Sequence, residues 1–266
     1  MSIGRYRERA LAAAAAAACA LVAGACTGPA WGQEGVEPEA ARILKSMTDF
    51  LGSSTSFSAS YDSDHEIVDR SGQKLEFSAS GKIELERPGK FHAVREGTLT
   101  SAEIFLDGGT VTVYDKTANA YAQMAVPDGS IDGAIDEIRM ETGIDISGAD
   151  LLYSNAYEGL TTDVESGRVV GSAYVEGRET QHLAFRAKDV DWQIWIEDGD
   201  KPVPLKYVIT SKWVTGAPQF TIVLSDWNVG QTMDPATFVF SPPDGSIKLD
   251  SLQTDETGEI ASEAQQ

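Results

Sequence analysis

A strict alternation of apolar and polar side chains over residues 73–86 is the feature that most limits what this chain can fold into. Leu75, Phe77, Ile83 and Leu85 fall at alternate positions together with small residues, and mostly lysine, glutamate and serine fill the positions between them. Because successive side chains of a β-strand point to opposite faces, the pattern predicts a strand about 40 Å long, at about 3.3 Å per residue, with one face buried. Such a strand needs partner strands and a cover for its apolar face.

Further runs with strand character recur on both sides of the middle of the chain, separated by turns rich in glycine and polar residues. Their short connections predict antiparallel neighbours. The predicted strands are residues 57–69, 90–97, 101–106, 110–114 and 120–125 in the first half, and 167–176, 180–187, 191–197, 203–212, 219–227 and 237–240 in the second.

Two stretches instead follow the period of a helix. Ile43, Leu44, Met47, Phe50 and Leu51 fall on one helical face close to the N-terminus.

The second helical stretch separates the two groups of strands. Ile131, Ala134, Ile135 and Ile138 form one stripe behind Ser130, which is placed to act as the N-cap. A shorter helical piece is expected over residues 149–156. The length of the chain fits one large β-rich domain as well as two smaller ones.

The N-terminus has the plan of a secretory signal. Arg5, Arg7 and Arg9 precede an uncharged, alanine-rich stretch over residues 10–25. This stretch is shorter than the roughly 20 strongly apolar residues of a membrane-spanning helix. Residues 23–25 fit ordinary signal peptidase, and residues 22–26 also resemble a bacterial lipobox, with Ala23 where leucine is usual.

Cysteine usage favours the lipobox. Cys19 leaves with the signal, so Cys26 would be the first residue of the mature chain and its only cysteine. We therefore expect a lipid anchor on Cys26. Thr27, in place of aspartate, favours anchoring in the outer membrane. Secretion without lipid, after cleavage behind Ala25 or within residues 30–33, is the alternative.

The expected organisation follows from these segments. Residues 1–25 form the signal peptide, 26–39 a tether, 40–249 a single domain and 250–266 an acidic disordered tail. Without the signal the chain keeps 18 basic and 40 acidic residues, a net charge of −22. A surface of that sign repels nucleic acid and anionic headgroups. We expect no nucleic-acid partner.

The sequence lacks a recognisable catalytic or metal-binding constellation. His65, His92 and His182 fall on different predicted strands without the spacing of a metal site. Residues 128–139 imitate a calcium loop, but Arg139 stands where a bidentate glutamate is required. No nucleophile elbow, phosphate-binding loop or zinc-protease motif occurs. We expect no catalytic residue, no metal and no cofactor.

Several strings resemble a family of predicted periplasmic proteins of unknown function (domain of unknown function 2092). The resemblance covers residues 40–243. It is carried by residues 85–91 (LERPGKF), 149–154 (ADLLYS), 182–185 (HLAF) and 190–196 (VDWQIWI), with Tyr114-Asp115 and Tyr121.

That family is similar in architecture to the lipoprotein-carrier superfamily, which includes LolA, LolB and the sigma-factor regulator RseB. The resemblance implies an α+β fold, mainly β: a curved, unclosed antiparallel half-barrel of about 11 strands wrapped round two or three helices. It also implies an apolar cavity for a lipid or lipoprotein acyl chain. This inference rests on the fold, because no contact residue transfers by motif.

The sequence adds an independent reason to expect a cavity, because two or three helices must cover the apolar face of about 11 strands. Ile135 and Ile138 are expected to act as a lid. The lining residues expected on strands are Leu75, Phe77, Ile83, Leu85, Leu183, Phe185, Trp192, Ile194 and Leu205. A closed core without a vacancy is the alternative. A protein-interaction or stress-sensor module, similar to RseB, is the alternative function.

Overall fold

The computed structural model describes residues 35–142, 146–251, 253–254 and 260–261. The predicted signal peptide (1–25) and Cys26 lie outside the described residues, and so does most of the predicted tail (250–266). Within that tail, strand β14 (Gln253–Thr254) pairs with β15 (Ile260–Ala261). None of the helices in the described ranges is long and apolar enough to cross a membrane.

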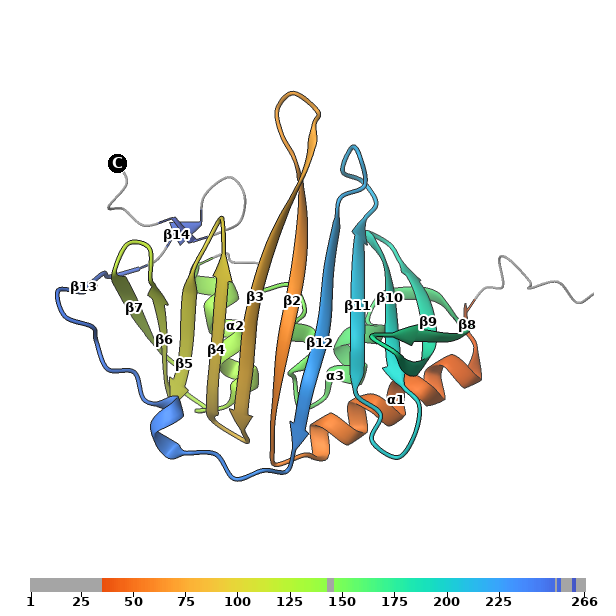
Figure 1. Cartoon of the computed structure of the whole chain (residues 1–266), viewed down its shortest axis with the longest axis horizontal. Coiled ribbons are helices and arrows are strands. Elements are labelled where there is room, and N and C mark those ends of the chain that lie inside the picture. Colours follow the sequence, from red (N-terminus) through yellow and green to blue (C-terminus); the bar gives the residue numbers. More distant parts are fainter. Residues whose placement is uncertain (1–34, 143–145, 252, 255–259, 262–266) are drawn as a thin grey trace, which may run out of the picture. The chain divides into compact units, whose positions relative to one another are not determined.

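Within these residues, thirteen strands form one sheet, and eleven long strands lie between a two-residue strand at each edge (Figure 1). The edge strands are β1 (Gly35–Val36) and β13 (Ile247–Lys248). The long strands are β2 (Ser56–Val68), β3 (Lys74–Glu86), β4 (Lys90–Gly97), β5 (Ala102–Asp107), β6 (Thr110–Asp115), β7 (Ala120–Ala125), β8 (Val164–Val175), β9 (Arg178–Ala187), β10 (Val190–Glu197), β11 (Pro204–Ser211) and β12 (Gln219–Val229).

The strand order joins the two β-rich halves of the sequence. It runs β1-β8-β9-β10-β11-β12-β2-β3-β4-β5-β6-β7-β13, so β12 pairs antiparallel with β2, from Phe220 opposite His65 to Val229 opposite Phe57. Neighbours are antiparallel except at the edges, where β1 runs parallel to β8 and β13 to β7. The two edge strands do not pair with each other. The predicted unclosed antiparallel sheet is confirmed.

Three helices cover one face of this sheet: α1 (Pro38–Ser53), α2 (Ile131–Thr142) and α3 (Ala156–Thr161). The predicted stripe on α1 is buried at Ile43, Leu44, Met47 and Leu51. Ser130 caps α2 as predicted, because its hydroxyl oxygen accepts a hydrogen bond from the Gly133 amide at 2.9 Å.

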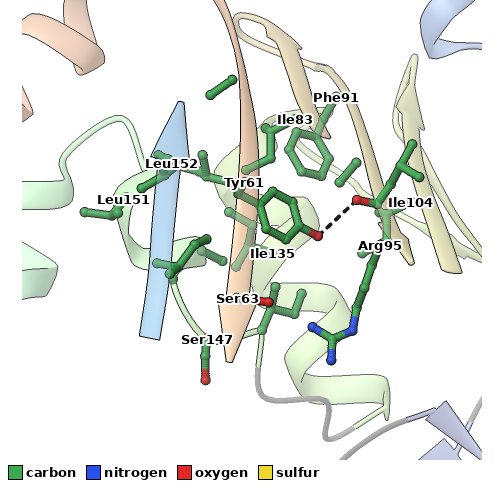
Figure 2. Close-up of a pocket in the computed structure, with 18 of the residues that line it drawn as sticks. Tyr61, Ser63, Ile83, Phe91, Arg95, Ile104, Ile135, Ser147, Leu151 and Leu152 are labelled. Carbon is green, nitrogen blue, oxygen red and sulfur yellow. Dashed lines mark hydrogen bonds between the residues drawn. The ribbon is translucent and has the colours of Figure 1, made fainter. Parts of the chain in front are cut away.

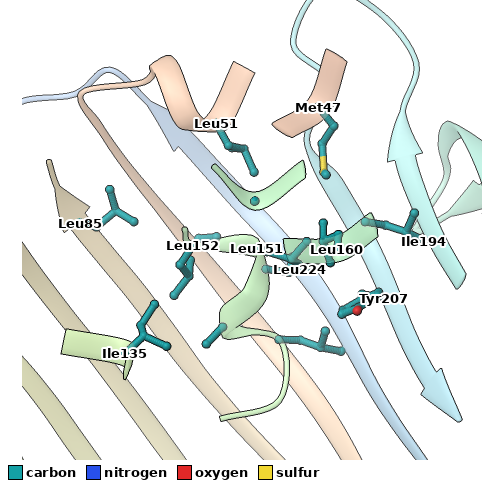
Figure 3. Close-up of a cluster of buried hydrophobic side chains, with 14 of the residues drawn as sticks. Met47, Leu51, Leu85, Ile135, Leu151, Leu152, Leu160, Ile194, Tyr207 and Leu224 are labelled. Atoms are coloured by element: carbon teal, nitrogen blue, oxygen red, sulfur yellow. The ribbon is translucent and has the colours of Figure 1, made fainter. Parts of the chain in front are cut away.

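The apolar side chains of the helices and of both halves of the sheet form one buried cluster. In Figure 3, Met47 and Leu51 of α1 and Leu160 of α3 lie over the strands that carry Ile194 and Leu224. The sheet therefore wraps round the helices, as the resemblance implies.

Glycine on the inner face lets two aromatic rings lie across the sheet. Tyr61 of β2 stands opposite Gly81 of β3, and a Cβ at Gly81 would come within 2.0 Å of the Val94 carbonyl oxygen and 2.5 Å of the Tyr61 ring. Phe185 and Gly167 form the same kind of pair in β9 and β8. Such glycine–aromatic pairs fix the register and allow the sheet to bend.

Three segments differ from prediction. Residues 237–240 do not form a strand: the 3₁₀ turn η2 (Pro235–Phe238) occupies this place, because the Asp234 side chain accepts from the Ala236 amide and Pro235 favours the first position of a turn.

The helix predicted over 149–156 is divided into the 3₁₀ turn η1 (Ala149–Leu151) and α3, which begins at Ala156. The predicted tether (26–39) overlaps ordered structure, because β1 pairs with β8 and α1 already begins at Pro38.

Gly81→Ala tests the glycine–aromatic pair. We expect the free energy of unfolding to fall by about 1–3 kcal/mol, because the new methyl group must displace both the Tyr61 ring and the β4 backbone. The measurement is urea unfolding. Gly159→Ala is the matched control: Gly159 is an exposed position of α3 with open space around it, so this change should stabilise the protein by up to about 1 kcal/mol. Equal stability of wild type and Gly81→Ala would contradict the packing described.

Candidate functional site

An apolar pocket of about 200 Å³ lies between the first half of the sheet and the segment from α2 to η1 (Figure 2). It is bounded by β12, β2, β3, β4, β5 and β6 on the sheet side. The sheet contributes Phe57, Ala59, Tyr61, Ser63, His65, Ile83, Phe91, Ala93, Val94, Arg95, Ala102, Ile104, Val111, Phe220, Ile222, Leu224 and Trp227. The remaining lining residues are Thr100, Ile131, Ala134, Ile135, Ile138, Ile146, Ser147, Gly148, Ala149, Leu151 and Leu152.

The lining changes from apolar to polar along the strands. Strand β2 presents Phe57, Ala59, Tyr61, Ser63 and His65 in succession, because alternate residues share a face. The order therefore runs from an aromatic ring and a methyl group to a hydroxyl and an imidazole.

Strand β4 repeats this change in the same rows. Through β3, Phe91 aligns with Phe57, Ala93 with Ala59, and Arg95 with Tyr61. The Tyr61 hydroxyl donates a hydrogen bond to the Val94 carbonyl oxygen at 3.0 Å (Figure 2).

Polar contacts hold the helical wall of the pocket in place. The Ser154 amide and hydroxyl both donate to the Asp132 carboxylate of α2. The Tyr153 hydroxyl donates to Asp136 at 2.6 Å, and Arg139 donates to the Tyr153 oxygen and to Asp150. These contacts tie α2 to η1 and to the segment that follows it.

One group of this wall, Tyr153, and one group that contacts the wall, Arg87, have shifted pKa values. Burial, and then the hydrogen bond to Asp136, raises the pKa of the Tyr153 hydroxyl to about 12, so the hydroxyl remains a donor at neutral pH. Burial lowers the pKa of Arg87, and the Asp132 charge opposes that shift. Arg87 donates to the Leu152 carbonyl oxygen at 2.8 Å and so links the end of β3 to the same wall.

Three of the predicted lining residues lie in this pocket: Ile83, Ile135 and Ile138. Leu85 is fully buried in the core cluster and is not among the lining residues. Leu75 and Phe77 do not line the pocket: they precede Ala79, the first residue of β3 that pairs with β4, and Leu75 is 36% exposed. In Figure 1 the β2–β3 hairpin extends past its neighbours. The alternating pattern of residues 73–86 therefore continues beyond the part of β3 that lines the pocket.

The other predicted lining residues pack in the second half of the sheet. Leu183, Phe185, Ile194 and Leu205 are buried in the core cluster there and do not line the apolar pocket. Phe185 stacks on Trp192 at 4.0 Å between ring centroids, and Tyr207 meets Trp192 edge-on. These rings pack against one another, and Trp192 and Tyr207 also line a second, more polar cavity.

Most of the lining was not predicted. Phe57, Ala59 and Tyr61 were not named, although β2 alternates them with Ser58 and Ser60 and so carries a usable signal. The contributions of β12 follow from its pairing with β2, a contact between distant parts of the chain that periodicity does not reveal.

A second, more polar cavity of about 330 Å³ lies beside the first, between α3 and strands β10 to β12. His65, Ser147 and Phe220 line both cavities. Trp192 lines the second one.

The histidines form local contacts. His92 lies 3.2 Å from Glu103, and His182 stacks on Trp195 at 4.0 Å; burial lowers the pKa of His182. Within the described ranges, no group of three or more His, Cys, Asp or Glu side chains could hold a metal ion.

Comparison with protein families gives one match. The model of the family described as "Predicted periplasmic protein (DUF2092)" matches residues 40–251. No curated protein matches the chain.

Similar solved structures include LprF from Mycobacterium bovis, with 14% identity, a TM-score of 0.48 and coverage of 79% of this chain and 98% of that one. The lipoprotein LppX from Mycobacterium tuberculosis has 12% identity, a TM-score of 0.41 and coverage of 74% and 98%. A LolA superfamily protein from Nitrosomonas europaea has 9% identity, a TM-score of 0.39 and coverage of 76% and 97%. These likenesses are too distant to transfer a function to this chain.

Proposed function

The chain belongs to the DUF2092 family of predicted periplasmic proteins, and from this premise we propose that it is a non-catalytic envelope protein that binds a lipid or lipoprotein acyl chain. The proposed site is the apolar pocket between β2–β6, β12 and the α2–η1 segment. The observation that carries the proposal is the size of this pocket combined with its lining, which is mostly hydrocarbon.

The pocket is partly open to solvent, so filling it gains free energy from the apolar surface that ligand and lining remove from water. An acyl chain would contribute about 0.8 kcal/mol per buried methylene.

The lining also suits an acyl chain better than a compact ring. Its apolar groups come from alternate residues along β2 and β4 and from the length of α2, so they form an elongated surface. Hydrocarbon of that shape binds by burial and needs no catalytic group. The volume exceeds that of the apolar cavity of about 150 Å³ that takes up benzene or xenon.

For the location of the protein, we propose a lipid anchor on Cys26 in the outer membrane. The support is the lipobox-like sequence before Cys26 and the threonine after it. An anchored protein cannot diffuse across the periplasm, so lipidation would make it a stationary receptor or binder.

A protein-interaction or stress-sensor role without transport is the second candidate. It is supported by exposed apolar side chains between β11 and β12, where Trp213 is 75% and Val214 is 51% exposed. The neighbouring β2–β3 hairpin exposes Leu75. In this alternative the tips of the two hairpins would contact a protein partner.

Ile83→Glu tests acyl binding. A carboxylate in the apolar lining would have to lose its water when the pocket fills, so uptake of a fluorescent acyl probe should weaken by at least about ten-fold. Phe77→Glu is the matched control, because Phe77 lies on the same face of β3 but outside the pocket. Uptake by this control should match wild type.

Both variants should be checked by far-UV circular dichroism and thermal melting. Equal uptake by folded Ile83→Glu and wild type would refute the proposed site. Loss of uptake in Phe77→Glu alone would place the ligand at the hairpin instead.

Cys26→Ala tests the anchor. In cells labelled with a radioactive palmitate, the wild-type protein should carry label and fractionate with the outer membrane. The variant should lose the label and appear in the soluble periplasmic fraction. An unlabelled wild-type protein would instead establish secretion without lipid.

A further inference from the structure

The two ends of the apolar pocket differ in polarity. In Figure 2, Phe91 and Ile83 lie at one end, and the Arg95 side chain extends toward the end with Ser63 and Ser147. The strand rows agree with this view, because Arg95 aligns with Tyr61 and Gly81, two rows away from the row of Phe57, Leu85 and Phe91.

The charge of the lining is opposite to that of the chain. Among the lining residues that the structure describes, Arg95 is the only arginine or lysine, and none is an aspartate or glutamate. The chain as a whole has 41 acidic and 21 basic residues. The formal charge carried by the described lining residues is therefore positive, and it comes from Arg95.

A second polar group lies close to Arg95. Ala102 of β5 is the strand partner of Arg95, and Thr100 lies two residues before Ala102. Thr100 also lines the pocket. Thr100 is 4% exposed, and its buried hydroxyl makes no hydrogen bond to any described residue. A buried hydroxyl without a partner costs about 1–3 kcal/mol. An acceptor atom supplied by a ligand would remove this cost.

Arg95 can serve a ligand together with contacts inside the protein. A guanidinium has five N–H donors in a planar fork, and it matches the two oxygens of a carboxylate or a phosphate. The acidic surface repels anions at long range, but salt reduces this repulsion beyond about 8 Å at physiological ionic strength. Contacts within the pocket then decide the preference.

We infer that the pocket takes a single-chain amphiphile with an anionic headgroup, a carboxylate or a phosphate. Its head contacts Arg95 and the Thr100 hydroxyl, and its chain runs along β2 and β4 toward Phe57 and Phe91. The volume of about 200 Å³ is below the roughly 300–1,000 Å³ of sites for drug-sized ligands, which favours one chain over two. This inference rests on the proposed acyl-binding function.

Calorimetric titration of the purified protein with four matched ligands tests the inference. Laurate and dodecyl phosphate carry an anionic head, dodecanol a neutral one and dodecyltrimethylammonium a cationic one. The two anions should bind about ten-fold or more tightly than dodecanol, because hydrogen bonds to charged groups exceed those between neutral groups. The cation should bind more weakly than dodecanol.

Three variants assign this preference to the polar end. Arg95→Met should reduce the affinity for both anions to about that for dodecanol. Thr100→Val keeps the shape and removes the hydroxyl, so it should weaken anion binding by a few fold. Arg186→Met is the control, because Arg186 is an exposed residue of β9 outside the pocket, and should bind all four ligands as wild type does.

The outcomes separate the two proposals. Equal affinity of wild type for laurate and dodecanol, or an unchanged preference in folded Arg95→Met and Thr100→Val, would overturn the anionic headgroup and leave acyl binding intact. Failure of all four ligands to bind would overturn acyl binding as well. Binding of one anion without the other would support the inference and identify the headgroup as carboxylate or phosphate.

Discussion

In the part of the chain that the structure describes, three helices cover the apolar face of the sheet, and they cover its two halves unequally. Under β8–β11, Phe185 stacks on Trp192 within the core cluster, and the cavity that remains beside α3 is the more polar of the two. Under β2–β6, the cover is α2 with the turn η1, whose alanine and isoleucine side chains leave the apolar pocket open. The position of the candidate site follows from this asymmetry.

The pairing of β12 with β2 completes the wall of the apolar pocket. It places Phe220, Ile222 and Leu224 from late in the sequence against the first half of the sheet, so the pocket has a wall that neither half would form alone. The Gly81–Tyr61 pair lies within the same wall. A change at the pairing would therefore alter fold and site together.

Local patterns predicted the elements well. The strand limits at residues 120–125 and 90–97 agree with the structure, and the helical stripes on α1 and α2 are buried as expected. Capping by Ser130 could be predicted because it depends on neighbours in sequence. The strand predicted at residues 237–240 was wrong because Asp234 and Pro235, just before it, begin a 3₁₀ turn. The last residue of that turn, Phe238, is buried although it belongs to no strand.

The candidate site was harder to predict because it depends on contacts between distant residues. Alternation identifies the inward face of β3 but not where the helical cover ends, so Leu75 and Phe77 could not be separated from Ile83. In the same way, the prediction of which face of β9 and β10 is buried was correct. The stacking of Phe185 on Trp192 behind that face depends on side-chain packing, which alternation does not reveal. Arg95 gained significance only when the rows across β2, β3 and β4 placed it in the pocket.

Native mass spectrometry of the protein after gentle extraction from its own envelope tests the central claim, acyl binding in the apolar pocket, most directly. We predict one bound single-chain acyl species per protein chain, released on collisional activation. A clean mass without adduct, together with no uptake of added acyl ligand, would contradict the account.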